Sequence, residues 1–170
     1  AQGAGLALTE RGEVIVDEYL RTSDPDIYAA GDIAAWPDPT FEKRLRVEHW
    51  DVARRQGLRA GRNMAGEEKP YTALPYFCSD MFDMSFEVWG NLMSWDKTVL
   101  RGDLGSSSYQ LFYFDQDEDD RDRRLVGVLT VGRLGDARKA IPKLVKARLA
   151  YGEVADQLRD EEVELNSKME

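Results

Sequence analysis

Hydrophobic and polar positions in the first part of the chain predict two short strands, a loop and one long helix. The runs at 13–17 and 27–30 are strand-like, and the second has the small and aliphatic residues of a strand buried on both faces, as in a parallel sheet. Two prolines and several charges predict a loop at 36–43. A one-faced stripe then predicts a helix in which Asp51 is the N-cap or an acidic residue of the first turn, and which stops at Gly66. The stripe consists of Ala53, Gln56, Gly57, Ala60 and Met64.

The second part of the chain has four strand-like segments followed by helical ones. The segments lie at 86–89, 98–101, 108–114 and 125–131, and their short connections predict antiparallel pairing in a meander. A helix is expected at 137–148, capped by Asp136 and kinked or started near Pro142. A further turn or two is expected at 153–158, before a charged end that frays.

Strands followed by helices without alternation predict an α+β module, an antiparallel sheet of four or five strands covered on one face by C-terminal helices. The charged and proline-containing stretch 67–70 predicts a domain boundary, which divides the chain into 1–69 and 70–170. The acidic stretch 115–124 is interpreted as the solvated tip of a hairpin. It lacks the glycine and glutamate spacing of a calcium-binding EF-hand loop, so no metal site is predicted.

Net charge, the length of apolar runs and the cysteine count limit which partners and which cellular location are expected. The 170 residues carry a net charge of −9, which disfavours nucleic acid and anionic membranes but would suit a basic redox partner. No apolar run approaches the roughly 20 residues of a membrane span. A single cysteine, Cys78, excludes an internal disulfide and predicts a reducing, cytoplasmic location.

Gly31 and Asp32 are the first candidates for a binding site. They follow the predicted buried strand, at the end where open α/β sheets bind ligands, and a glycine lets the backbone approach a ligand closely. The segment LRTSDPDIYAAGD resembles the second FAD-binding motif of the pyridine-nucleotide flavoprotein reductases. The resemblance implies that Asp32 accepts a hydrogen bond from a ribityl hydroxyl of FAD. The alternative is that Asp32 is only a turn residue.

The start of the predicted helix supplies three more candidates. The segment VEHWDVARRQGLRAGRNMAG resembles a helix of ferredoxin-reductase-like flavoproteins and of apoptosis-inducing factor. This implies that Glu48, His49 and Trp50 lie beside the flavin, where helix N–H groups suit its electron-rich pyrimidine end. Flavin proximity, rather than acid–base catalysis, is the role expected for the single histidine. Trp50 could alternatively be a staple against the core.

Cys78 is the last candidate, and it departs from the family pattern. The segment PYFCSD resembles the P-x-F-W-S-D motif that opens the C-terminal domain of this family, with cysteine where the motif has tryptophan. A thiol has no π-face, so any stacking would pass to Tyr76, Phe77 or another group. Cys78 is expected to be a small buried residue, and a redox thiol is the weaker alternative.

These resemblances imply the C-terminal part of an FAD-dependent NAD(P)H oxidoreductase. In the intact protein, electrons would pass from nicotinamide through flavin to an acceptor such as ferredoxin, rubredoxin, a quinone or oxygen. The chain has no G-x-G-x-x-G fingerprint, so we expect most of both nucleotide domains to lie outside it and the chain alone to be inactive. The alternative is a non-enzymatic module for homodimerisation or for docking an iron–sulfur protein through its sheet edge or through Trp89, Trp95 and Tyr113.

Overall fold

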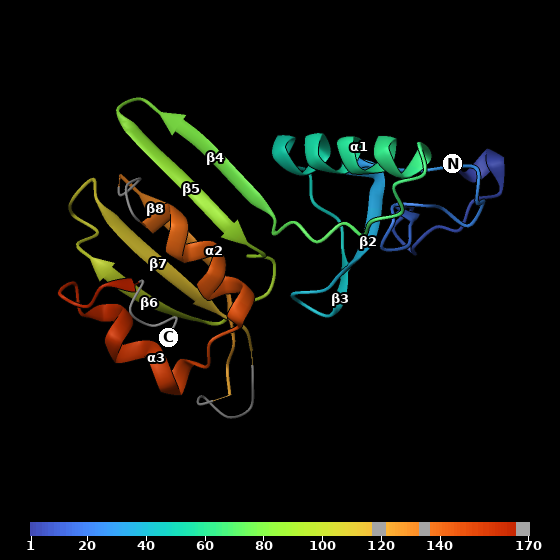
Figure 1. Ribbon diagram of the computed structural model, residues 1–170. Helices are drawn as coiled ribbons and strands as arrows, with labels where there is room; N and C mark the ends of the chain where they lie inside the picture. Colours follow the sequence, from blue (N-terminus) through green and yellow to red (C-terminus); the bar gives the residue numbers. More distant parts are fainter. Residues whose placement is uncertain (117–121, 133–136, 166–170) are drawn as a thin grey trace. The chain divides into compact units, whose positions relative to one another are not determined.

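The computed structural model describes residues 1–116, 122–132 and 137–165, which form two compact units, Ala1–Pro75 and Tyr76–Glu170 (Figure 1). Each unit is described by itself. Parts of the predicted acidic tip (117–121) and of the predicted frayed end (166–170) lie outside the described residues, as does the predicted cap Asp136. No helix among the described residues is long and apolar enough to cross a membrane.

The first unit contains a small mixed sheet and one long helix. Strands β1 (Val14–Ile15) and β2 (Ala34–Asp38) pair in parallel, and β2 pairs antiparallel with β3 (Lys43–Leu45). Two short 3-10 helices, η1 (Gln2–Ala4) and η2 (Gly31–Ile33), complete the unit together with α1 (Trp50–Met64). Its core is aliphatic and aromatic, with Val14, Val16, Leu20, Trp36 and Val52 all at most 1% exposed.

The predicted strand at 27–30 is wrong. This segment forms only an isolated antiparallel bridge, between Tyr28 and Arg21, and Ile27 is exposed. Residues 24–26 form a turn that brings the segment back against the preceding residues, where the Thr22 N–H donates to the Ile27 carbonyl at 2.9 Å. The backbone groups are therefore satisfied locally rather than by a parallel neighbour.

The predicted loop at 36–43 is a hairpin of β2 and β3. The Asp38 carboxylate accepts hydrogen bonds from the N–H groups of Thr40 and Phe41, which stabilises the tight turn between the strands. Trp36 and Phe41 are buried, and Trp36 packs edge-on against Tyr71. Prolines that predict a loop are thus tolerated in and beside a short strand because the turn and the core fix the backbone.

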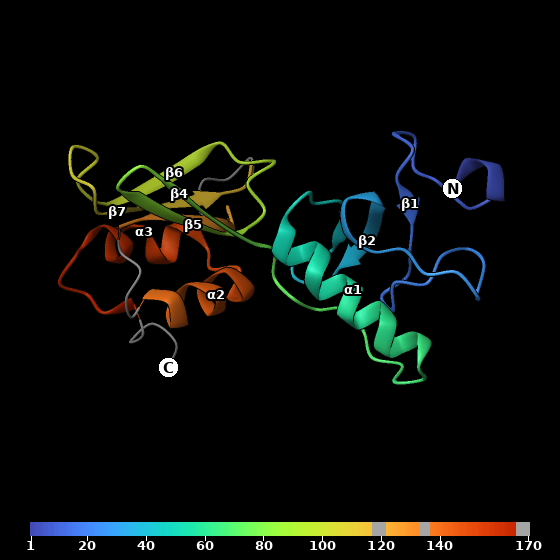
Figure 2. The same cartoon turned by 90° about the horizontal axis from the view of Figure 1, so that it is seen from above.

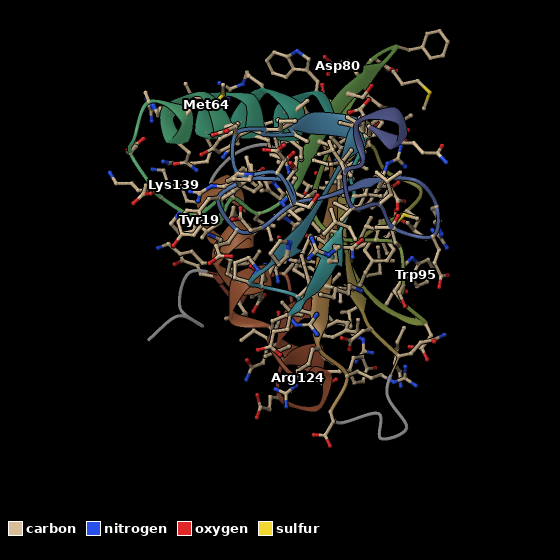
Figure 3. All side chains as sticks on the ribbon, turned by 90° about the vertical axis from the view of Figure 1, so that its right-hand side faces the viewer. Tyr19, Met64, Asp80, Trp95, Arg124 and Lys139 are labelled. Atoms are coloured by element: carbon tan, nitrogen blue, oxygen red, sulfur yellow. The ribbon has the colours of Figure 1, made fainter. Side chains whose placement is uncertain are left out.

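Helix α1 confirms the predicted element but buries a slightly different face. Asp51 lies in the first turn, one of its two predicted positions, and the N-cap is His49. The buried positions are Asp51, Val52, Gln56, Ala60 and Asn63. Gly57 and Met64 of the predicted stripe are exposed, with Met64 near the end of the helix (Figure 3). The stripe is displaced because Asn63 is buried: its side chain bonds to the Tyr19 carbonyl and to both backbone groups of Lys69.

The second unit is a five-stranded antiparallel sheet in the order β4-β5-β8-β7-β6. The strands are β4 (Tyr76–Met81), β5 (Met84–Gly90), β6 (Lys97–Gly102), β7 (Tyr109–Phe114) and β8 (Leu125–Val131). The antiparallel sheet is confirmed, but a simple meander is wrong, because β5 pairs with β8 rather than with β6.

Both C-terminal helices, α2 (Ala137–Ala147) and α3 (Tyr151–Arg159), lie on one face of this sheet (Figure 2). The layer between sheet and helices holds the largest buried apolar side chains of the unit, which are Phe112, Phe114, Leu125, Ile141, Leu144 and Leu158. A helix start near Pro142 is wrong, since α2 runs from Ala137 through this residue to Ala147, while the alternative of a kink there stays a prediction. Burial of the helix face compensates for the hydrogen bond that proline cannot make.

The two units divide after Pro75, six residues beyond the predicted boundary at 69. Residues of this connecting segment pack within the first unit. The Tyr71 N–H donates to the Glu18 carbonyl at 2.7 Å, and the Tyr71 ring lies 5.7 Å from that of Trp36.

Candidate cofactor site

Gly31 opens the η2 turn and is held against helix α1. It is buried, and its φ of +76° lies in the left-handed region that glycine adopts without a steric cost. Its N–H donates to Oε1 of Gln56 at 2.8 Å. A Cβ at this position would lie 3.1 Å from Cβ of Ala53. The turn therefore sits directly on the first half of α1, and a side chain at residue 31 would crowd it.

Asp32 projects from this turn into solvent. Within the described residues its carboxylate accepts no hydrogen bond and forms no ion pair, while its backbone carbonyl accepts a hydrogen bond from Nε of Arg46 at 2.7 Å. It borders an open hollow of about 450 Å³ that is lined by Arg11, Gly12, Glu13, Asp32, Ile33 and Arg46. The carboxylate is therefore oriented by its backbone and available to a donor.

The start of helix α1 lies beside the turn. His49 is the N-cap, and no side chain caps the first helical N–H groups. These groups carry a partial positive charge, which suits an electron-rich ligand. Asp51 is engaged elsewhere, in ion pairs with Arg55 at 2.5 Å and Arg54 at 3.1 Å. The helix start can therefore offer its backbone donors to a bound molecule.

Glu48 and Trp50 flank the helix start on the surface. Glu48 forms an ion pair with Arg46, the residue that also holds the Asp32 carbonyl. The Trp50 side chain is 78% exposed, and the Arg54 guanidinium lies 5.5 Å from the centre of its ring. The alternative of a core staple for Trp50 is therefore wrong. An exposed indole of this size can pack against a flat apolar ligand.

Burial lowers the pKa of His49 below its ordinary value of 6.5, and the negative charge of Asp32 acts in the opposite direction. The unfolded chain binds a proton more readily than the folded chain does. Stability that depends on neutral His49 is therefore present above pH 6.5 and is lost as the pH falls below this value.

We expect Asp32→Asn to lower the pKa of His49 further, because it removes the opposing charge. His49 is the single histidine of the chain, so its ring resonances can be followed without overlap in an NMR pH titration. Asp26→Asn, a change of the same charge at another exposed carboxylate, is the control and should leave the pKa unchanged. An equal response to both substitutions would contradict a specific Asp32–His49 interaction.

Cys78 lies in the second unit, on strand β4, and is exposed rather than buried as expected. The reason is that β4 is an edge strand with a neighbour on one side only. Cys78 pairs across the strands with Glu87, whose carboxylate accepts a hydrogen bond from the Tyr76 hydroxyl at 2.7 Å. Tyr76 packs on Trp89, whereas Phe77 lies on the other face against Phe86.

The structure thus brings Gly31, Asp32, Glu48, His49 and Trp50 together around the start of α1, while Cys78 belongs to the other unit. Sequence reasoning overlooked Arg46 and treated Gln56 only as part of the helix stripe. A fully polar side chain on a predicted buried stripe was the signal for Gln56, since such a group needs a hydrogen-bond partner. Within the described residues, no cluster of His, Cys, Asp or Glu could hold a metal ion.

Two family models match the chain. The pyridine nucleotide-disulphide oxidoreductase model covers residues 1–57, and the reductase C-terminal model covers residues 76–169. The second match takes in more than half of the chain. The chain belongs to the reductase C-terminal family. Specifically, it corresponds to the C-terminal portion of pyridine nucleotide-disulphide oxidoreductases, enzymes that use FAD and NAD(P)H.

Similarities to individual proteins agree with this assignment. Monodehydroascorbate reductase of Pisum sativum is 31% identical over 97% of this chain and 38% of its own length. The ferredoxin–NAD(+) reductase component of the anthranilate 1,2-dioxygenase system of Burkholderia cepacia is 33% identical over 83% of this chain and 34% of its own. The ferredoxin reductase for the CYP199A2 system of Rhodopseudomonas palustris superposes with a TM-score of 0.81 at 27% identity, covering 99% of this chain and 39% of that one. The chain thus spans less than two fifths of these relatives.

The residues at the start of α1 fit a flavin nucleotide chemically. An available carboxylate at Asp32 suits sugar-like hydroxyl groups, and uncapped helix N–H groups suit an electron-rich ring. The exposed indole of Trp50 offers an apolar surface beside them. The buried left-handed Gly31 lets this backbone lie close to the helix, a geometry that a Cβ would obstruct.

Proposed function

We propose that residues 31–50 form one wall of the FAD site of an NAD(P)H oxidoreductase. The observation that carries this proposal is the η2 turn, which places an exposed Asp32 carboxylate beside the uncapped start of α1. Family membership supports the choice of FAD as the ligand. No residue of this chain is assigned to a covalent or proton-transfer step.

Each residue of this wall has a distinct part in the proposal. Asp32 accepts a hydrogen bond from a hydroxyl of the ribityl chain, and the first N–H groups of α1 face the electron-rich end of the ring. Trp50 excludes water from one side of the site, and Arg46 with Glu48 keeps the turn in place. Bound FAD would supply the transfer of electrons from nicotinamide to an acceptor, while the protein contributes position and electrostatics.

For the acceptor we propose an iron–sulfur protein of the ferredoxin kind. The support is the similarity to ferredoxin reductases, in sequence and in structure. The chain alone is proposed to be inactive, since it spans less than two fifths of these relatives. A reducing, cytoplasmic location stays a prediction that rests on the single exposed cysteine.

An FAD titration of the whole chain, followed by flavin absorbance and fluorescence, tests the proposed site. Asp32→Ala is expected to weaken binding by roughly 10- to 100-fold, because a hydrogen bond to a charged group contributes about 1.5–3 kcal/mol. Trp50→Ala should weaken binding by a few-fold, about 0.5–1.5 kcal/mol of stacking. Asp26→Ala removes the same charge elsewhere and should leave the affinity unchanged. Equal affinities for all four proteins would overturn the proposal.

The alternative of a homodimerisation or docking module also stays a prediction. One face of the second sheet, opposite the helices, carries a row of partly exposed apolar side chains, one from each strand: Phe77, Val88, Leu129, Leu111 and Leu100. On the same unit Trp95, labelled in Figure 3, is 44% exposed. Its ring packs edge-on against that of Tyr113. Light scattering over a range of protein concentrations distinguishes self-association through such a surface from a strict monomer.

A further inference from the structure

We propose that Gln56 is a positioning residue, which sets the η2 turn against helix α1 and thereby fixes Asp32 relative to the helix start. This inference deepens the proposed function and rests on it for the identity of the ligand. Gln56 is 0% exposed, so it touches no ligand itself. Its effect is transmitted through the backbone of Gly31, whose N–H it accepts at 2.8 Å.

The hydrogen bonding of the Gln56 amide points to this role. Oε1 accepts from Gly31, whereas the buried Nε2 has no partner among the described residues. A buried donor without a partner costs about 1–3 kcal/mol, so a hydrocarbon side chain of similar volume would suit the packing better. What only the amide provides at this position is an acceptor for the backbone of the turn.

Gly31 has a specific need for that acceptor. Its N–H is buried, and η2 lies outside the β-ladder of the first unit, so a strand neighbour does not satisfy this group. On one side of the turn Gln56 and Ala53 of α1 contact Gly31, and on the other side Arg46 holds the Asp32 carbonyl. The turn is therefore held between the helix and the strand end.

This arrangement matters for the proposed site because its two parts come from different elements. Asp32 belongs to the turn, and the uncapped N–H groups belong to α1. A ligand that contacts both gains affinity only if their separation is fixed beforehand, since an adjustable separation costs ordering free energy on binding. The Gly31–Gln56 hydrogen bond supplies that connection.

Gln56→Met, which keeps the volume and removes the acceptor, tests the assignment in the full 170-residue chain. Asn63→Ala is the matched control, because Asn63 is a buried amide on the same helix face that bonds to Tyr19 and Lys69 instead. In Gln56→Met the Gly31 amide should exchange its hydrogen about tenfold or more faster than in Asn63→Ala, as for loss of one hydrogen bond. Gln56→Glu, which retains an acceptor oxygen, should restore protection.

A second readout is the NMR titration of His49, whose pKa Asp32 raises. If the turn loosens, the pKa of His49 should fall in Gln56→Met and not in Asn63→Ala. Should Gln56→Met fail to fold, Gln56→Asn is the substitute, because its side chain is one methylene shorter and its amide oxygen lies farther from the Gly31 N–H. We expect the same changes in Gly31 exchange and His49 pKa for this variant. Equal Gly31 exchange and equal His49 titration in the Gln56 and Asn63 variants would overturn the proposal.

FAD titration separates this inference from the proposed function. If the unmodified chain binds FAD, Gln56→Met should weaken binding about tenfold more than Asn63→Ala does, and equal weakening would count against a positioning role. If the unmodified chain does not bind FAD, the proposed function fails for this chain. The role of Gln56 is then decided by Gly31 exchange and by the His49 titration alone.

Discussion

Gly90→Ala is expected to destabilise the second unit by about 4 kcal/mol or more, among the largest effects of a single substitution. A Cβ at this position would lie 2.2 Å from the Val126 carbonyl oxygen and 2.9 Å from Cα of Gly127. Both are backbone atoms of the neighbouring strand β8, so a rotamer change cannot relieve the clash. The φ of +94° at Gly90 adds strain for any residue with a side chain.

Native-state hydrogen exchange of the β7 and β8 amides measures this loss unit by unit. Gly61→Ala is the control for the same chemical change: Gly61 lies within α1, its φ is not in the left-handed region, and a Cβ there would meet no atom within 4 Å. That variant should stabilise the first unit by roughly 0.8–1 kcal/mol through helix propensity. Wild-type protection of β8 in Gly90→Ala would show that the strands do not approach as closely as described.

Arg101→Met is expected to cost roughly 3–5 kcal/mol, because it removes a buried charged donor from a set of acceptors. The guanidinium, in a side chain only 6% exposed, donates to four backbone carbonyls at and beyond the end of α3. These belong to Leu158, Asp160, Glu161 and Val163. Without Arg101, these carbonyls lose the hydrogen-bond donors that strand β6 provides to them.

Urea unfolding and limited proteolysis together test this role. Arg101→Lys keeps the charge but presents one ammonium group, which cannot reach four carbonyls in a planar fork, so it should recover only a small part of the loss. Arg159→Ala removes an arginine with an exposed ion pair to Asp156 and should change stability by about 0–1 kcal/mol. Cleavage at 160–165 should accelerate in Arg101→Met alone. Unchanged cleavage there would contradict the role of Arg101.

The sequence was informative wherever a pattern is local. The spacing of apolar residues located β5 to β8 and the helices. Buried positions recur with a period of about 2 residues in a strand and about 3.6 in a helix, so the sequence itself carries this signal. The segments around Gly31, Asp32 and His49 carried the family resemblance, and the structure brings these residues together at the start of α1. Gly31 was predicted as a position where the backbone can approach a ligand, and the structure adds that it forms a left-handed turn beside helix α1.

Predictions from the sequence were wrong for features that depend on contacts between segments distant in the chain. The β5–β8 pairing joins strands separated by two others, and no local pattern reports it. The exposure of Cys78 follows from the position of β4 at the sheet edge. Residues 27–30 have strand-like composition, yet they fold back on a neighbouring turn because that turn satisfies their backbone.

By itself, then, the sequence determined the family and the α+β character of the second unit, and it predicted a candidate site among residues 31–50. Only the tertiary structure decided which groups hold that site in place. Gln56 is one apolar-stripe position among several in the sequence, and its contact with Gly31 spans 25 residues. The physical reason is that the structural role of a buried polar side chain depends on its hydrogen-bond partner. Partners that are distant in sequence come into contact only once the chain has folded.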